Sequence, residues 1–293
     1  MRDFGRCGVL STSQLLSQKS GRLDTSLGLP CPTVSGLFVY PIKSCAGISI
    51  QETQLTVKGL VHDREWAIID GQRNKVMTQR RYPKLALIRP KVLPRLDTEE
   101  SKTIVLTAEG MSDIEVPVAR AGDGELRAVT IWDDTVEAVD QGDAAAMWLD
   151  SFLGEGLNCS FRLVRAKEGF TRHTKPKYAP RHSTHFADAF PFLLALEESL
   201  EEFNTKLEVP VPMNRFRPNV NQATGEVHPE RQPSRTIVRE RNGARLGFTD
   251  GKKHEGYFGS NLVLEMKELN SISPRLAVGA NVKVLSLKTE VVA

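Results

Sequence analysis

Three short segments of the chain carry basic side chains next to groups that could help them bind an anion. Lys43 and Ser44 follow an apolar run that ends at a proline, and a lysine charge with a serine hydroxyl can bind a phosphate. Arg64 lies between two acidic residues, and Arg217 and Asn219 flank another proline. Each segment alone also fits an ion-paired surface turn, so anion binding and a purely structural role both stay open.

The cysteines and histidines form no familiar metal-binding pattern. The cysteines are isolated, which indicates a reducing compartment in a chain of this length; they are Cys7, Cys31, Cys45 and Cys159. His182 and His185 would share a metal only on a helix, and Pro180 argues against a helix there. Serine-nucleophile, glycine-rich phosphate-loop and H-E-x-x-H motifs are absent from the sequence.

The composition is that of a globular protein rather than a nucleic-acid-binding or membrane-spanning one. Of the 293 residues, 40% are hydrophobic and 26% charged, with a formal net charge of +3. No basic run is interleaved with aromatic residues, and no stretch approaches the roughly 20 apolar residues of a membrane-spanning helix. Residues 1–35 contain many Ser, Thr and Gly residues with scattered Arg and Lys, and either a disordered tail or a weak organellar presequence fits them.

The first half of the chain, from Gly36 to about residue 165, predicts a barrel or sandwich of short strands. Apolar or alternating runs are separated by turn residues such as Asp70-Gly71 and Asp133-Asp134. Strands are expected at residues 37–40, 48–50, 55–57, 67–69, 86–88, 103–106, 129–132 and 136–139. Many short strands at this spacing are typical of all-β architectures.

The second half predicts a mixture of helices, strands and long loops. A helix is expected from Asp143, whose carboxylate could cap the first turn, to Gly154. An amphipathic helix is expected from Leu196, because apolar residues recur there at helical spacing. Strands are expected at 161–164 and 282–285, residues 192–195 fit a strand or a helix start, and 165–187 fit a loop. Residues 221–256 are almost wholly polar, and order is expected to resume over 257–264.

Several separate motifs, in one order along the chain, resemble a known family. Residues 40–47, 63–66 and 78–80 look like the β-barrel domain that precedes a MOSC domain, and residues 186–194, 214–219 and 257–259 look like the MOSC domain itself. The resemblance implies a β-rich α+β fold: a tail over 1–35, an N-terminal β-barrel domain over 36–165 and a MOSC β-barrel domain with a few helices over 166–287. These motifs resemble those of the mitochondrial amidoxime-reducing components, which are molybdenum oxidoreductases that reduce N-hydroxylated compounds.

The resemblance also implies which residues hold the cofactor, Mo-molybdopterin. The N-terminal domain contributes two cations and a hydroxyl. The MOSC domain contributes a loop under the cofactor, an R-P-N element and an asparagine after an F-G pair. In this chain they are Lys43, Ser44, Arg64, Asp188, Ala189, Phe190, Arg217, Asn219 and Asn261. A phosphorylated pterin needs cations for its phosphate, and molybdenum needs a soft thiolate from the protein.

One departure from the family concerns that thiolate. The family continues after R-P-N through further strands to a cysteine that ligates molybdenum, whereas here Val220 and the residues after it match the segment beyond that cysteine. Neither Cys45 nor Cys159 occupies the ligand position. The sequence therefore predicts an internal truncation near 219/220, unpaired sheet edges and weak or absent molybdenum binding, with no catalytic or metal-ligand residue identified.

Other interpretations stay open. The chain could be a sulfur carrier like the C-terminal part of molybdenum cofactor sulfurase, which would require an exposed and reactive Cys45. Pyridoxal phosphate on Lys43 is a variant of that idea, and an inactive isoform is a third. For the reductase, the resemblance implies cytochrome b5 and its reductase as electron-donating partners. A mitochondrial and a cytoplasmic location are both compatible with the sequence.

Overall fold

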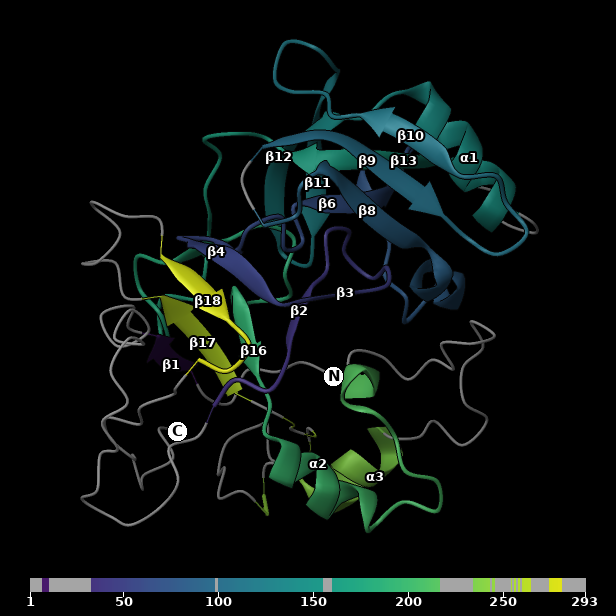
Figure 1. Cartoon of the computed structure of the whole chain (residues 1–293). Helices are drawn as coiled ribbons and strands as arrows, with labels where there is room; N and C mark the ends of the chain where they lie inside the picture. The colour runs from purple at the N-terminus through teal and green to yellow at the C-terminus, as the bar shows by residue number, and fades with distance from the viewer. Residues whose placement is uncertain are drawn as a thin grey trace.

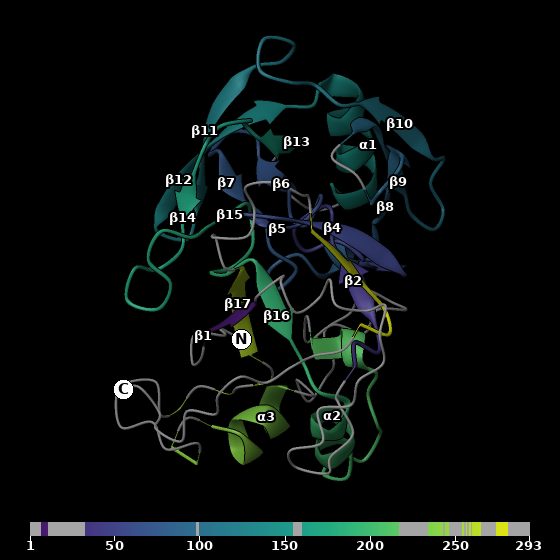
Figure 2. The same cartoon turned by 60° about the vertical axis from the view of Figure 1, so that its left-hand side comes forward.

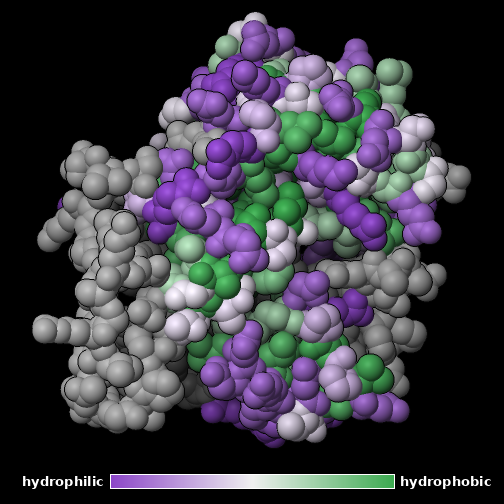
Figure 3. All heavy atoms as spheres, in the orientation of Figure 1, coloured by the Kyte–Doolittle hydropathy of each residue, from purple (hydrophilic) through white to green (hydrophobic). Residues whose placement is uncertain are grey.

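The computed structural model describes residues 7–10, 33–97, 100–154, 160–216, 234–242, 244–245, 254, 256, 258, 260–264 and 274–280. Strands dominate this part of the chain, and helices α1, α2 and α3 lie at its two ends (Figure 1). The predicted β-rich fold is therefore confirmed. Most of the described surface in this view is hydrophilic, with hydrophobic residues showing through near its middle (Figure 3).

A closed barrel forms the centre of the first half. Its strands follow the order β11-β12-β13-β6-β7, and their bounds are β6 Trp66–Asp70, β7 Lys75–Val76, β11 Leu126–Ile131, β12 Asp134–Asp140 and β13 Phe161–Ala166. Every residue of β6 is buried, which explains why Trp66 to Ile69 form a continuous apolar run rather than an alternating one. The strands expected at 67–69, 129–132, 136–139 and 161–164 all fall in this barrel.

A second layer packs an antiparallel sheet and helix α1 against the barrel. The sheet has the order β10-β9-β8, with β8 Arg89–Pro94, β9 Ser101–Thr107 and β10 Ile114–Pro117, and η1 Pro83–Leu87 is a short 3₁₀ helix before it. Helix α1 Asp143–Leu153 places Trp148 and Leu149 in the same apolar core as Ile104 and Phe161. Ile42 and Cys45 also belong to this core, so the core anchors the loop that carries Lys43.

The predicted cap of α1 is wrong in its chemistry, although the helix itself is confirmed. The capping position is taken by Gly142, whose φ of 93° suits a residue without a side chain. Asp143 is the first helical residue, and its carboxylate accepts a hydrogen bond from Arg162 at 2.6 Å. Asp143 therefore stabilises the helix through its charge near the positive end of the helix dipole and pairs with Arg162, but it is not the N-cap residue.

Smaller sheets connect the barrel to the second half of the chain. Two of them are β2-β3 and β18-β4-β5, with β2 Leu37–Val39, β3 Ile48–Ile50, β4 Glu52–Thr56, β5 Gly59–Leu60 and β18 Arg275–Ala277. Two others are β14-β15 and β1-β17-β16, with β14 Arg172–His173, β15 Ser183–Thr184, β16 Phe192–Leu194, β17 Ser260–Leu264 and β1 Cys7–Leu10. Figure 2 shows β16 and β17 between the barrel and helices α2 and α3.

Several elements differ from the sequence-based expectations. Strand β1 lies within the segment expected to be a tail, and it pairs in parallel with β17. Helix α3 Ser234–Glu240 lies within the polar span, where its buried Ile237 joins an apolar cluster with Phe203 of α2 Glu197–Asn204. Residues 165–187 contain the short β14-β15 ladder, and the strand expected at 282–285 lies outside the described residues. The domain boundary near residue 165 stays a prediction.

Candidate functional site

Three segments distant in sequence are joined by backbone hydrogen bonds beside the barrel. The amide of Lys43 donates to the carbonyl of Trp66 at 2.8 Å, and the amide of Arg64 donates to the carbonyl of Tyr40 at 2.7 Å. The amide of Phe186 donates to the carbonyl of Arg64 at 2.9 Å. The loop after β2, the turn before β6 and the loop after β15 therefore form one unit anchored to a buried strand.

A buried arginine fixes the third of these segments. Arg172 donates to the carbonyl oxygens of His185, Ala187 and Asp188 at 3.1, 2.5 and 3.2 Å. Its Nε lies 2.7 Å from a carboxylate oxygen of Asp134, which balances its charge. A single guanidinium with several rigid donors suits this task, since it satisfies carbonyl groups that have no strand partner.

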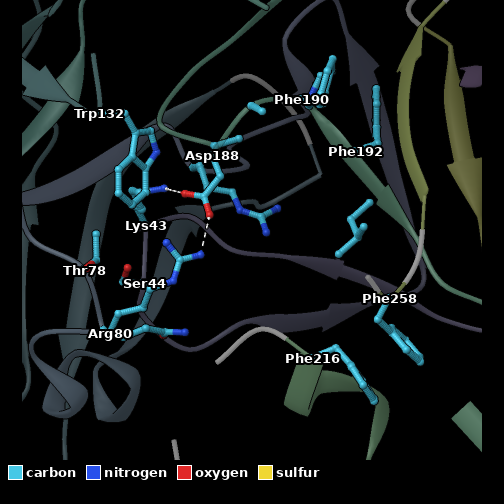
Figure 4. Close-up of a pocket in the computed structure, with 16 residues that line it drawn as sticks. Lys43, Ser44, Thr78, Arg80, Trp132, Asp188, Phe190, Phe192, Phe216 and Phe258 are labelled. Carbon is cyan, nitrogen blue, oxygen red and sulfur yellow. Dashed lines mark hydrogen bonds and ion pairs between the residues drawn. The ribbon is translucent and has the colours of Figure 1, made fainter. Parts of the chain in front are cut away.

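A pocket opens where the three segments meet. Its walls come from the loop after β2, the turn before β6, the segment after β7, Trp132 and the 187–193 segment, with aromatic residues at the far side (Figure 4). It is lined by Lys43, Ser44, Arg64, Thr78, Gln79, Arg80, Trp132, Ala187, Asp188, Ala189, Phe190, Pro191, Phe192, Leu193, Phe216 and Phe258.

Asp188 joins two cations at one side of the pocket. Its carboxylate oxygens lie 2.5 Å from Nζ of Lys43 and 3.3 Å from a guanidinium nitrogen of Arg80. Both cations also face the ring of Trp132, at 5.7 and 5.5 Å from its centroid. Carboxylate and indole together offset the repulsion between two neighbouring positive groups.

Arg64 forms a second basic group with its own counterion. Its guanidinium nitrogen lies 2.5 Å from Asp63 and its guanidinium carbon 4.5 Å from the ring centroid of Tyr40. Asp63 in turn accepts a hydrogen bond from the amide of Tyr40 at 2.9 Å. Burial alone would lower the pKa of Arg64, but the carboxylate of Asp63 outweighs it and raises that pKa above its usual value.

The backbone is left-handed at three residues that line the pocket. Ser44, Arg64 and Trp132 have φ values of 71°, 50° and 54°, and none of them is a glycine. Such a conformation costs roughly 1–2 kcal/mol per residue, so it persists only where the surrounding contacts enforce it. Strain of this kind gathers at binding sites, where it holds side chains in directions that relaxed backbone would not give.

Aromatic rings form the opposite side of the pocket. Phe216 and Phe258 stack with ring centroids 3.5 Å apart and an interplanar angle of 11°. Phe203 packs edge-on against Phe216 from behind, at 5.7 Å. The pocket therefore combines a basic side with a flat apolar side, an arrangement that suits a phosphate attached to a flat ring.

Comparisons with known proteins identify the segment that carries the basic side. Residues 31–156 match the family described as "MOSC N-terminal beta barrel domain". Residues 31–156 are a MOSC N-terminal beta barrel domain. Lys43, Ser44, Arg64, Arg80 and Trp132 all belong to it, whereas the aromatic side of the pocket comes from residues beyond it.

Curated relatives extend beyond this domain. "Mitochondrial amidoxime-reducing component 1" of Mus musculus is 34% identical over 196 residues, which cover 64% of this chain and 54% of that protein. The human protein of the same name is 30% identical over 210 residues, 68% of this chain and 58% of its own length. "Molybdenum cofactor sulfurase" of Bos taurus is 27% identical over 228 residues, 71% of this chain and 25% of that protein. The chain thus spans about half the length of the amidoxime-reducing components it matches.

The structure brings most of the predicted site residues together. The MOSC N-terminal domain contributes three and the loop after β15 contributes three to the one pocket: Lys43, Ser44, Arg64, Asp188, Ala189 and Phe190. Arg217 and Asn219 lie outside the described residues. Asn261 is a residue of β17, paired with Leu193 of β16. A cofactor-binding role for all of these residues stays a prediction.

Sequence reasoning missed other residues that line the pocket. Arg80 was noted only as part of a family motif, and Trp132 only as the end of a strand. Phe216 and Phe258 come from distant segments, and no local pattern announces their stacking. The one available signal was Thr78-Gln79-Arg80, a polar triplet directly after an apolar strand.

No cysteine thiol lines the pocket among the residues that the structure describes. Cys45 is only 3% exposed and packs in the apolar core with Ile42 and Trp66, so its thiol does not line the pocket. Across the described ranges, no group of three or more His, Cys, Asp or Glu side chains could hold a metal ion. Those ranges also contain no helix long and apolar enough to cross a membrane.

Proposed function

We propose that this protein is a molybdopterin-binding oxidoreductase of the class that reduces N-hydroxylated compounds, and that the pocket is its cofactor site. The convergence of Lys43, Ser44 and Arg64 on one pocket supports the proposal, because these are the residues that family resemblance assigns to the cofactor. Similarity to proteins named amidoxime-reducing components supports it independently of the pocket.

Each side of the pocket has a task in this proposal. Lys43 and Arg64 would neutralise the phosphate of the pterin, and the hydroxyl of Ser44 would donate a hydrogen bond to it. Phe190 and the aromatic residues opposite would exclude water and orient the ring system. When bound, the cofactor supplies two-electron reduction with removal of oxygen from nitrogen; the residues of this chain bind and orient.

We further propose site residues from the MOSC domain, of which Arg217 and Asn219 lie outside the described residues, and electron-donating partners. Arg217, Asn219 and Asn261 are proposed to complete the cofactor site from the MOSC domain. Cytochrome b5 and its reductase are the proposed electron donors. The names of the relatives support a mitochondrial location, and a cytoplasmic location is equally compatible with the sequence.

The missing cysteine divides the proposal into two measurable parts. The basic side of the pocket can hold the phosphorylated pterin without a metal ligand from the protein, whereas molybdenum needs a thiolate. We therefore expect this chain to retain more pterin than molybdenum, and to reduce an amidoxime slowly or not at all.

The test is to purify the chain from a bacterial host that makes the cofactor. Pterin is measured as its fluorescent oxidation product and molybdenum by mass spectrometry, in the wild type and in Lys43→Gln. Lys167→Gln is the matched control, because Lys167 is also paired with a carboxylate but lies outside the pocket. Pterin should fall at least severalfold in Lys43→Gln alone. Equal pterin content in all three proteins, or none in any, would refute the proposal.

A second candidate is a cofactor-handling module related to molybdenum cofactor sulfurase. The similarity to that protein over 71% of this chain favours it. Transfer of sulfur through Cys45 is disfavoured, because its side chain is buried in the apolar core. Pyridoxal phosphate on Lys43 is disfavoured by the ion pair between that amine and Asp188, since Schiff-base formation needs a neutral amine. Absence of a pyridoxal absorbance band would count further against it.

A further inference from the structure

The ion pairs of Asp188 are unequal in their exposure to solvent. The Lys43 side chain is 6% exposed, whereas those of Asp188 and Arg80 are 43% and 41% exposed. The carboxylate therefore lies on the solvent side of a buried cation. Burial of an ammonium away from negative charge is strongly unfavourable, so the carboxylate of Asp188 stabilises the charged form of Lys43.

The backbone of Asp188 is held in place from behind. Arg172 binds the carbonyl oxygens of Ala187 and Asp188, which leaves the side chain of Asp188 as the part of this residue able to move. Rotation of that side chain would carry the carboxylate, which is already half exposed, into water, and an incoming anion would then take its place beside Lys43. Lys43 has no such freedom, since its side chain is enclosed.

The charges around the pocket favour an incoming anion with more than one negative charge. Lys43, Arg64 and Arg80 all line the pocket, and Asp188 also contributes to the raised pKa of Arg64. One carboxylate thus lies within the field of three cations, one of which has a separate partner in Asp63. A singly charged anion offers nothing that Asp188 does not already supply, whereas a phosphate or pyrophosphate group offers more charge and more acceptors.

We propose that Asp188 is an internal counterion that occupies the phosphate position of the ligand-free pocket and is displaced when a phosphorylated ligand binds. Asp188 then sets both affinity and selectivity: it keeps the buried lysine paired in the empty protein and competes with weakly charged anions. This inference rests on the proposed anion-binding role of the pocket and names the residue that controls it.

The test uses inorganic pyrophosphate and isothermal titration calorimetry with the purified chain. Asp188→Asn keeps the size of the side chain but removes its charge, and binding should tighten about tenfold, the effect of about 1.4 kcal/mol of lost competition. Glu137→Gln is the matched control, because Glu137 also pairs with a lysine, Lys167, and is similarly exposed. Its affinity for pyrophosphate should equal that of the wild type.

Two further variants and one structure make the test decisive. Lys43→Gln should abolish binding, and the double variant with Asp188→Asn should show no gain. Unchanged or weaker binding in Asp188→Asn would overturn the proposal, since Asp188 would then support the ligand rather than compete with it. Should Asp188→Asn not fold, a crystal structure of the wild type with pyrophosphate decides: the contact between Asp188 and Lys43 must be broken, and an intact contact overturns the proposal.

This result is separable from the fate of the proposed function. Pyrophosphate binding requires neither pterin nor molybdenum. If Asp188→Asn binds pyrophosphate about tenfold more tightly but the chain retains no pterin, the counterion proposal stands and only the oxidoreductase proposal is refuted. If the chain retains pterin but Asp188→Asn does not bind pyrophosphate more tightly, the counterion proposal is refuted and the oxidoreductase proposal stands.

Discussion

Ser44 illustrates how a single residue can exchange stability for binding. Its φ of 71° favours glycine, yet a serine stands there with its side chain lining the pocket. We predict that Ser44→Gly raises the free energy of unfolding by about 1 kcal/mol, because glycine removes the left-handed strain. The same variant should weaken pyrophosphate binding, because the hydroxyl donor is lost. Urea unfolding and calorimetry measure the two effects.

Arg181→Gly provides the control for this prediction. Arg181 has a similar φ of 68° but does not line the pocket. Its replacement should raise stability to a comparable extent and leave pyrophosphate binding unchanged. A loss of stability in Ser44→Gly would show that the serine side chain itself holds the turn.

At this scale the sequence indicated the basic residues but not their partners. Lys43 and Arg64 stand out because cations follow or precede apolar runs, a local pattern. The role of Trp132 could not be predicted from local sequence. Its ring lies near Lys43 only because strands distant in sequence close into a barrel. The stacking of Phe216 on Phe258 likewise depends on chain segments that only the folded state brings together.

At the scale of elements, Arg172 determines the shape of the loop after β15. Three carbonyl oxygens and one carboxylate converge on its guanidinium. We predict that Arg172→Leu lowers the free energy of unfolding by about 3–5 kcal/mol, because these acceptors and Asp134 lose their buried partner. Thermal melting measures the loss, and limited proteolysis should show new cleavage within 185–191.

The conservative variant separates charge from geometry in this prediction. Arg172→Lys keeps the ion pair with Asp134 but cannot reach several carbonyl groups at once, so an intermediate loss is expected. Equal stability of the lysine variant and the wild type would contradict the role assigned to the guanidinium fork.

Helices and strands were predicted correctly where apolar residues recur at a spacing typical of one of the two. The strands at 67–69 and 136–139 and the helix ending at Gly154 follow from local patterns, and the structure contains them. Strand β1 was missed because its partner β17 lies at the other end of the chain. Helix α3 was missed because its polar sequence buries little more than Ile237, which packs against aromatic residues supplied from elsewhere.

At the scale of the molecule, a buried charged cluster ties stability to pH. Burial alone would raise the pKa of Glu65, but its hydrogen bond from His62 and the charge of Arg165 lower it to about 2. Burial lowers the pKa of His185 to about 4. Below pH 6.5 the unfolded state therefore takes up a proton at His185 that the folded state does not, and below 4.5 the same holds for Glu65.

We predict a loss of stability in two steps as pH falls. The His185 step spans pH 6.5 to about 4. The Glu65 step spans 4.5 to about 2 and amounts to about 3 kcal/mol when complete. Urea unfolding across this range should show both steps in the wild type and only the lower one in His185→Gln. The exposed His173, replaced by Gln, should leave the profile unchanged. A His185→Gln profile identical to the wild type would contradict this account.

The junction between Asn219 and Val220 can be checked in the transcripts that encode this chain. Lys43, Ser44 and Arg64 form one side of a pocket. The family resemblance predicts that the cysteine which would ligate molybdenum is missing from the sequence. Residues kept for a cofactor are hard to explain in a chain that never binds it, so we expect most transcripts to carry extra codons, including a cysteine codon, between Asn219 and Val220. Sequencing transcripts across that junction measures this directly. A junction that reads as printed in all transcripts would contradict the expectation, and the pocket would then be an anion site that works without a protein thiolate.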